Sequence, residues 1–331
     1  MQNAKIIAPA TSYKNAVQLF EAGADEVYFG VITKKWKETF GEADLASRRQ
    51  GTPANICDEK EMSDIADYAL THNKNATLVV NTNYTQVQMP YITSLIDLWD
   101  GLGGQSLMVS DIGVLLYLLK KGSRLKRYLS LMGNTFNSYG GGFYQSLGVS
   151  RIVFPRELSV SEIENITKST DNIEYEVLMM LQKCQFIDGY CGFYHGRHLP
   201  DHLPSYFEYH KAVGSTMPVT YSHDPAYEGP GCYINWTTGK GKVTNLERND
   251  FTGPHCGCCY LNKLYDAGVN HFKIAGRGYS QDFIVKTVRF IKATTMLWAS
   301  NKDEAIIKAS IRQLYQNVYG EYCNEQKCYF E

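Results

Sequence analysis

The sequence shows no charge excess, no long apolar run and no low-complexity tract. Its 331 residues hold 33 Lys and Arg against 34 Asp and Glu, a formal net charge of −1. Proteins that bind nucleic-acid backbones commonly have an excess of basic residues, so this balance disfavours a nucleic-acid partner. No apolar run approaches the roughly 20 residues that span a bilayer, and the start, MQNAKIIAPA, lacks the order of a secretory signal. We therefore predict a cytoplasmic protein without membrane segments.

Two motifs that would identify a hydrolase are also missing. The chain has neither the H-E-x-x-H helix of zinc peptidases nor the G-x-S-x-G turn that exposes a serine nucleophile. These absences argue against a zinc peptidase and against a serine hydrolase of the common kinds.

The chain does contain a regular alternation of buried strands and amphipathic helices. Eight strand-like runs occur, with helical patterns such as 58–71, 112–120 and 159–168 between successive runs. This order predicts an α/β fold, a TIM-type (β/α)8 barrel, with an open doubly wound sheet as the alternative. The predicted strands are residues 5–8, 26–29, 76–81, 106–109, 128–132, 151–154, 174–180 and 271–274.

One connection is much longer than ordinary barrel loops. It separates the seventh predicted strand from the eighth and forms a Cys-rich excursion over residues 183–259. We predict a single barrel over residues 1–300 that includes this excursion, followed over residues 301–331 by a C-terminal helix and a Cys-containing tail. Long excursions at the end of a barrel strand commonly carry function.

Six of the nine cysteines lie in this excursion, in loop sequence rich in Gly and Pro. In a reducing compartment such thiols are more often ligands or reactive groups than disulfides. Cys57 lies elsewhere, and we expect it to be a buried core residue. The six are Cys184, Cys191, Cys232, Cys256, Cys258 and Cys259.

Barrel connectivity brings the two ends of the excursion together. Cys184 follows the seventh strand, and Cys256 precedes a predicted helix over 259–267 that starts at the same face of the barrel. A helix N-terminus favours the thiolate, the form that binds metal. The spacing does not match the short Cys pairs of structural zinc sites, but the residues leave both zinc and a [4Fe-4S] cluster open.

Several stretches of the chain resemble peptidase family U32, the collagenase-like family. The matching stretches occur in the family's order over residues 5–295, which makes the resemblance specific. They are IIAPATSYKNAVQLFEAGADEVYFG, VVNTN, LMVSDIGVL, GVSRIVFPRELSVSEI, KCQFIDGYCGFYHG, GPGC and LYDAGVNHFKIAGR.

The resemblance implies an iron–sulfur cluster held by Cys184, Cys191, Cys232 and Cys256, with Cys258 or Cys259 as alternates for the fourth ligand. Two departures from the family pattern stand out. The sequence GVITKKWKETFG replaces the family's usual Asn-x-Arg segment after the second strand. Ala275 stands where family members commonly have Glu. The first change alters the predicted pocket wall, and with the second any role of the family's acid is lost or moved.

Short family members resemble factors that hydroxylate quinone precursors without oxygen, often as heterodimers and with prephenate as a proposed oxygen donor. The resemblance therefore implies an oxygen-independent hydroxylase or related redox enzyme that acts on an aromatic or quinone-like small molecule. It also implies a heterodimer with a second family member, or a homo-oligomer. Three alternatives stay open: a collagenase-like peptidase, a non-catalytic partner subunit that carries a cluster, and an RNA-base hydroxylation factor.

Polar residues near the predicted strand ends complete the expected site. Arg156 and Arg277 can bind a dicarboxylate donor, although Arg156 can instead pair with Glu157 or another acid of the barrel. His195 or Asp111 would transfer protons. The polar residues expected to orient substrate are Tyr28, Asn81, Asn83 and Asn134.

The tail adds a C-x4-C pair, Cys323 and Cys328. Together with Cys258 and Cys259, these thiols would suffice for a second metal site. The alternative is that the tail cysteines are simply exposed or packed.

Overall fold

The structure is a computed structural model. It describes residues 1, 3–41, 46–49, 54–181, 187–190, 236–237, 243–244, 254–277, 279–300, 303–324 and 327–330. No helix in these ranges is long and apolar enough to cross a membrane.

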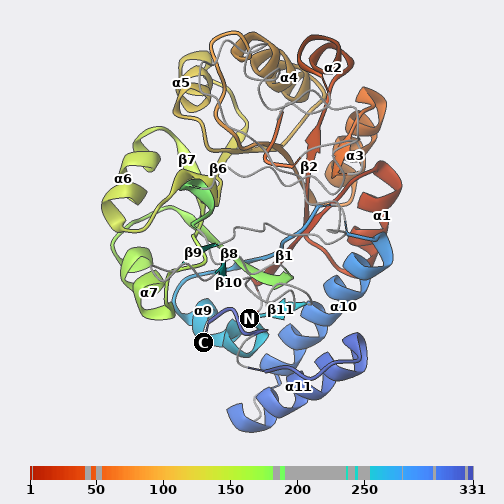
Figure 1. The fold of residues 1–331 in the computed structure, drawn as a ribbon, viewed down its shortest axis with the longest axis vertical. Coiled ribbons are helices and arrows are strands. Elements are labelled where there is room, and N and C mark those ends of the chain that lie inside the picture. The colour runs from red at the N-terminus through yellow and green to blue at the C-terminus, as the bar shows by residue number, and fades with distance from the viewer. Residues whose placement is uncertain are drawn as a thin grey trace.

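Eight parallel strands form a closed barrel, which confirms the predicted fold. Hydrogen bonding runs in the order β1-β12-β8-β7-β6-β5-β4-β2, and pairing between β1 and β2 closes the ring. Figure 1 shows the ring with helices around its outside. The barrel strands are β1 (Lys5–Pro9), β2 (Glu26–Val31), β4 (Asn75–Val80), β5 (Ser106–Val109), β6 (Lys126–Leu129), β7 (Val149–Val153), β8 (Glu174–Leu181) and β12 (His271–Ile274).

Helices follow the strands and cover the barrel. Local sequence fixes several of their ends: Ser159 and Glu162 form a capping box at the start of α7, and Gly23 ends α1 in the left-handed conformation. The helix α11 (Glu304–Tyr319) packs against α10 (Gln281–Trp298). The remaining helices of the ring are α1 (Tyr13–Ala22), α3 (Glu59–Thr71), α4 (Met89–Gly101), α5 (Ile112–Lys121), α6 (Ser138–Ser146), α7 (Val160–Lys168) and α9 (Leu261–Asp266).

Two apolar layers hold the barrel together. A large cluster lies between the strands and the helices, where Phe29 and Trp99 meet edge to face with ring centroids 5.4 Å apart. A smaller cluster combines side chains from six different strands. Parallel strands are buried on both faces, which explains why they appear in the sequence as continuous apolar runs. The smaller cluster comprises Ile7, Tyr28, Val79, Met108, Tyr128 and Val153.

The connection after β2 is more elaborate than the sequence predicts. It contains an additional helix α2 (Lys34–Phe40), capped by Thr33, and a short strand β3 (Asn55–Ile56) that pairs with β2. The expectation that Cys57 is buried is wrong. Cys57 is exposed, because it lies in the turn between β3 and the N-cap of α3 and does not face either apolar layer.

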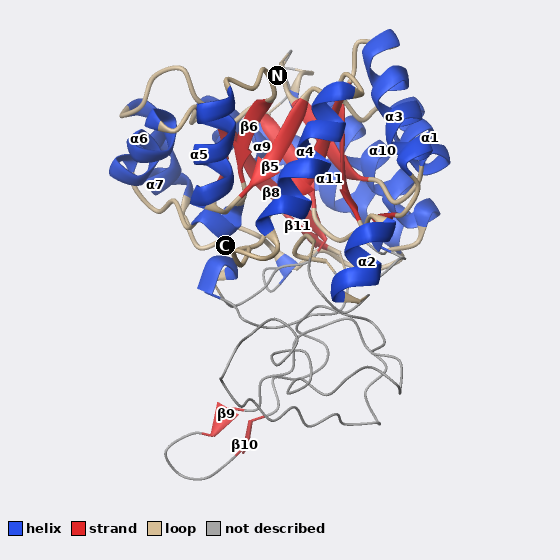
Figure 2. Ribbon diagram, turned by 90° about the horizontal axis from the view of Figure 1, so that it is seen from above, coloured by secondary structure: helices blue, strands red, loops and turns tan. Residues whose placement is uncertain are grey.

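A short strand returns the chain to the barrel after the excursion. The strand β11 (His255–Cys256) pairs antiparallel with the end of β8, with Cys256 opposite Met180. Figure 2 shows β11 at the end of the barrel opposite the N-terminus. The carboxyl ends of the barrel strands open at this end, which we call the mouth. Within the excursion, β9 (Trp236–Thr237) and β10 (Val243–Thr244) pair antiparallel. The division of the chain at residue 300 stays a prediction.

Candidate active site at the barrel mouth

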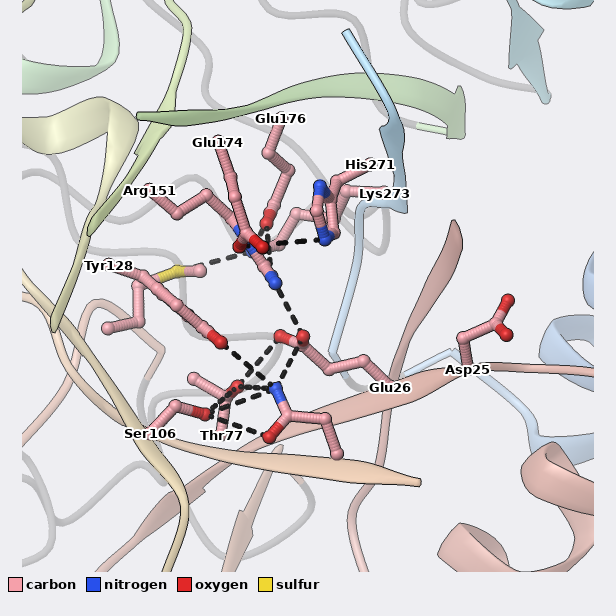
Figure 3. Close-up of polar contacts among 12 residues, drawn as sticks. Asp25, Glu26, Thr77, Ser106, Tyr128, Arg151, Glu174, Glu176, His271 and Lys273 are labelled. Atoms are coloured by element: carbon pink, nitrogen blue, oxygen red, sulfur yellow. Dashed lines mark hydrogen bonds and ion pairs between the residues drawn. The ribbon is translucent and has the colours of Figure 1, made fainter. Parts of the chain in front are cut away.

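A network of buried charges lies inside the barrel, toward the starts of the strands (Figure 3). We call it the charged layer and define it by Glu26, Arg151, Glu176 and Lys273. The Arg151 guanidinium lies 2.8 Å from Glu26 and 3.3 Å from Glu176, and Lys273 Nζ lies 2.8 Å from Glu176. These four residues are at most 4% exposed. Each charge in the layer therefore has an opposite charge beside it.

Neutral side chains also form hydrogen bonds to the charged layer. Asn75 donates to Glu26 at 2.6 Å, and Thr77 donates to Glu26 at 2.7 Å. Burial opposes ionisation of Glu26, but Arg151 and these donors outweigh burial and lower the pKa of the carboxyl. Burial lowers the pKa of Lys273, and Glu176 opposes that shift. A satisfied network away from the mouth indicates a structural role.

Arg277 occupies a different environment at the mouth. It is 7% exposed, and its Nη1 donates to Ser47 Oγ at 3.1 Å and to Asn55 Oδ1 at 3.2 Å. No carboxylate of the described residues forms an ion pair with Arg277. Burial lowers the pKa of Arg277 to about 10, so the side chain is still cationic at neutral pH.

Gly30 at the end of β2 makes space for this group. A Cβ atom at Gly30 would lie 2.1 Å from Asn55 Oδ1, 2.2 Å from Arg277 Nη1 and 2.8 Å from Ser47 Oγ. Any larger residue would force these side chains apart, since real Cβ contacts are never this short. The hydrogen-bonded arrangement of Arg277, Ser47 and Asn55 therefore depends on glycine at this position of β2.

Two further arginines lie at the mouth. Arg156, after β7, pairs with Asp188 in two contacts, Nε to Oδ2 at 2.9 Å and Nη2 to Oδ1 at 3.1 Å. Arg156 therefore forms an ion pair, as the alternative prediction had it, but with an acid of the excursion instead of Glu157 or another acid of the barrel. Burial lowers the pKa of Arg49, and the positive charge of Arg156 acts in the same direction. Three guanidinium groups, of Arg49, Arg156 and Arg277, thus lie at the mouth, and Arg156 is paired with Asp188.

The predicted polar residues lie at different depths. Tyr28 points into the barrel, where its hydroxyl donates to the Ile274 carbonyl at 2.9 Å. Asn81 accepts from the Arg48 amide and donates to Ser130 Oγ, both at 3.1 Å. Asn83 is exposed after β4. Their side chains do not form one hydrogen-bonded group in the described structure.

Asn134 has an unusual environment. It adopts the left-handed conformation with φ of 53°, and its Oδ1 is buried without a hydrogen-bond partner among the described residues. A Cβ at Gly189 would lie only 2.0 Å from that oxygen. Asn134 therefore packs directly against the 3-10 turn of residues 188–190 and presents an acceptor there.

Of the two predicted proton-transfer residues, only Asp111 lies in the described part of the chain. Its Oδ1 accepts from the amide of Gly113 at 2.6 Å, and its Oδ2 accepts from the amide of Tyr84 at 2.9 Å. Asp111 thus acts as the N-cap of α5 and anchors the loop after β4. His195 lies outside the described residues.

Of the four predicted cluster ligands, the structure describes Cys256 alone. Cys256 is 3% exposed at the mouth, and Cys258 is fully buried in the next turn. Buried thiols of this kind are donors that suit iron–sulfur clusters and zinc. Cys184, Cys191 and Cys232 lie outside the described residues. Within the described ranges, no group of three or more His, Cys, Asp or Glu side chains is arranged to hold a metal ion.

The tail reaches the mouth as well. Cys328 forms a parallel β-bridge with Cys256, and the Tyr329 amide donates to the Cys256 carbonyl at 3.2 Å. Tyr329 is 4% exposed and packs with Leu178 and Ala275 in a small apolar cluster. Cys323 is partly exposed. A second metal site that includes Cys258, Cys259, Cys323 and Cys328 stays a prediction.

Sequence reasoning missed several residues of the mouth. Ser47, Arg49 and Asn55 come from the connection after β2, where the chain departs from the family pattern. The two adjacent arginines of ASRR, residues 46–49, could have indicated a basic part of the site. Asp188 stands between two predicted ligands, Cys184 and Cys191, in the motif IDGY. Tyr329 carried no signal in the sequence.

Comparison with known families places most of the described barrel in one group. Residues 11–200 match the sequence model of peptidase family U32. This range is more than half of the chain and includes six of the eight barrel strands, from β2 to β8.

Individual relatives are more distant. A protein named tRNA hydroxylation protein P from Helicobacter pylori is 27% identical over 192 residues, which cover 58% of this chain and 42% of the relative. Its namesake from Haemophilus influenzae is 23% identical and aligns with 86% of this chain and 66% of the relative. A protein named collagenase from Porphyromonas gingivalis is 23% identical, with 87% and 64% covered. The chain therefore spans roughly four tenths to two thirds of the length of these relatives.

Proposed function

The chain belongs to peptidase family U32, and from this premise we propose that it takes part in oxygen-independent hydroxylation at the barrel mouth. The name of two of the relatives refers to hydroxylation, which supports this class of chemistry over peptide hydrolysis. The observation that carries the proposal is Arg277, a buried cation that meets neutral partners and no carboxylate in the described structure.

A buried guanidinium with neutral partners is suited to bind an anion. Ser47 and Asn55 hold Arg277 in place through Nη1 without neutralising it. The remaining N–H groups can form charge-assisted hydrogen bonds with a carboxylate, contacts that are about twice as strong as neutral ones. Arg156 and Arg49 add positive potential on the same side of the barrel. We propose a dicarboxylate oxygen donor in this pocket, with prephenate as the candidate.

The overall reaction would transfer a hydroxyl group. A C–H bond of the acceptor becomes C–OH, while the donor loses its hydroxyl and gains a hydrogen, so that oxidation of the acceptor balances reduction of the donor. The chain binds and orients the donor through Arg277, while Arg156, which is paired with Asp188, would contribute a weaker contact. His195 is the remaining candidate for proton transfer, because the described hydrogen bonds of Asp111 are those of a helix cap.

We propose that the family's [4Fe-4S] cluster binds at the mouth through Cys184, Cys191, Cys232 and Cys256. When bound, such a cluster supplies one-electron transfer. The described residues beside the ligand positions support this location: Leu181 lies opposite His255, and Asp188 is paired with Arg156. Cys258 and Cys259 remain alternates for the fourth ligand, and zinc remains the alternative metal.

Two classes of acceptor remain in competition. The relatives' name, tRNA hydroxylation protein P, favours tRNA, against the sequence-based preference for a quinone-like molecule. The formal net charge of −1 favours a small molecule. We propose tRNA as the first acceptor to test and an aromatic or quinone-like molecule as the second.

Collagenase activity is a further candidate because one relative bears that name. A heterodimer or homo-oligomer, in which this chain serves as the cluster-bearing subunit without turnover of its own, is also consistent with the family. Both ideas can be tested with the same purified protein.

The decisive experiment is anaerobic purification followed by iron, zinc and sulfide analysis. We expect a brown protein with about four iron and four sulfide per chain. A colourless protein with zinc, or without metal, would refute the cluster. Hydroxylated nucleosides in tRNA digests and hydroxylated quinones, compared between cells with and without the gene, would identify the acceptor. Release of peptides from gelatin by the metal-loaded protein would instead favour the peptidase.

A further inference from the structure

Residues 327–330 form a docked segment that closes one side of the mouth. The Cys256–Cys328 bridge aligns this segment with β11, and the amide of Tyr329 donates to the Cys256 carbonyl at 3.2 Å. Phe330 fills the space over Gly257, where a Cβ atom would lie 2.6 Å from its ring. Backbone pairing and side-chain packing therefore fix the same placement.

Tyr329 is directed into the barrel rather than toward solvent. It is 4% exposed, and its apolar contacts, Leu178 on β8 and Ala275 after β12, belong to two neighbouring barrel strands. The ring of His255 meets it edge to face, with centroids 6.3 Å apart. The ring thus packs in the small apolar cluster with a residue in the middle of β8 and the residue that follows β12.

The polar surroundings of Tyr329 are those of the proposed site. The charges of Arg156 and Asp188 act on its phenol, as does the Cys256 thiol. Arg156 is one of the cations assigned above to the donor, and Cys256 is the described candidate ligand. The tail therefore brings Tyr329 beside Cys256, the proposed metal ligand, at the side of the mouth where Arg156 and Asp188 act on its phenol.

We propose that residues 327–330 complete the active site and that the Tyr329 hydroxyl donates a hydrogen bond to an oxygen of the bound anionic donor. The inference rests on the proposed function for the identity of the ligand, but the placement of the segment does not depend on it. A phenol suits this role, since it stays protonated at neutral pH and can donate to a carboxylate or carbonyl oxygen beside a guanidinium.

The first test measures prephenate binding by titration calorimetry with the anaerobically purified holoprotein. Tyr329→Phe keeps the ring and removes the hydroxyl, and we expect binding about tenfold weaker or worse. Tyr322→Phe is the matched control, because Tyr322 is 76% exposed and should bind prephenate as the wild type does. Unchanged affinity in Tyr329→Phe would overturn the hydrogen bond to the donor.

The second test needs no ligand. Ala275→Leu would crowd the Tyr329 ring and release the segment, so hydrogen exchange of the residue 329 amide should become at least about tenfold faster. The double variant Ala275→Leu with Tyr329→Ala should restore slow exchange, because the added leucine then fills the vacated space. Unchanged exchange in Ala275→Leu would overturn the placement. If the wild type binds no prephenate, the proposed donor is wrong, and this exchange result alone supports or overturns the closing segment.

Discussion

The charged layer and the mouth lie in the same barrel but differ in the partners of their buried cations. In the charged layer, Arg151 and Lys273 lie within 2.8 Å of Glu26 and Glu176, respectively. At the mouth, Arg277 is equally buried but is held by a hydroxyl and an amide oxygen. A buried charge that is paired can serve structure alone, whereas one that meets only neutral partners keeps its capacity for an external anion. The comparison therefore separates the part of the interior that stabilises the barrel from the part that can bind substrate.

The largest expected effect is at the mouth. Cys256→Ser should reduce iron in the anaerobically purified protein from about four per chain to nearly none, because a cluster needs its full set of thiolates. Cys57→Ser is the control, since Cys57 is exposed and distant in sequence from the predicted ligands. Full iron content in Cys256→Ser, with loss in Cys258→Ser or Cys259→Ser, would transfer the ligand role to that residue.

The second prediction concerns a substitution in the charged layer. Arg151→Met leaves Glu26 and Glu176 buried without their guanidinium, and we expect the free energy of unfolding to fall by about 3–5 kcal/mol. Urea denaturation measures this loss. Arg124→Met removes an arginine whose side chain is 70% exposed and should change stability by less than about 1 kcal/mol. A similar small change in Arg151→Met would show that the charged layer is not a structural unit.

The third prediction concerns Arg277, where we expect a loss of ligand binding with little loss of stability. Arg277→Met should weaken prephenate binding about 10- to 100-fold, because charge-assisted hydrogen bonds contribute about 1.5–3 kcal/mol. The free energy of unfolding should change by less than in Arg151→Met, since no described carboxylate loses its partner. Arg124→Met, which removes an arginine whose side chain is 70% exposed, is the binding control. A large loss of stability with unchanged binding would assign Arg277 to the barrel scaffold instead.

The smallest effect concerns pH. Burial lowers the pKa of His271, and the charge of Arg151 adds to this shift, so the folded state keeps the imidazole neutral below its usual pKa of 6.5. The unfolded state then binds more protons, and stability falls as the pH drops through 6.5 toward the lower folded value. In urea denaturation, the free energy of unfolding of His271→Gln should therefore fall less than that of the wild type as the pH is lowered. Parallel pH profiles for the two proteins would contradict the prediction.

Sequence pattern predicted the barrel well because its strands are buried on both faces. Apolar runs such as 106–109 cannot remain soluble unless both faces are covered, so their order alone indicated the fold. The prediction for β6 extended too far, to residue 132, because apolar residues 131–132 continue the strand-like pattern although they belong to a 3-10 turn. Apolar content does not distinguish a strand end from a buried turn.

The mouth was only partly predictable. Arg156 and Arg277 could be placed because they follow strand ends, and barrel connectivity puts such residues on one face. Tyr329 and Asn55 could not be placed, because their positions depend on which segments dock against β11 and β2 after the barrel has formed. Pairing between distant segments leaves no periodic trace in the sequence.

The pairing of β11 with β8 affects how well the protein can tolerate insertions and deletions in the excursion. It joins Leu181 to His255, so the excursion leaves and rejoins the barrel at adjacent positions. The entropy of closing such a loop grows only with the logarithm of its length, by about 0.6 kcal/mol for each doubling. Residues can therefore be inserted or removed between these two points at little cost to folding. The barrel can therefore tolerate changes in the length of the excursion, provided that the proposed ligands and the Arg156–Asp188 pair are kept.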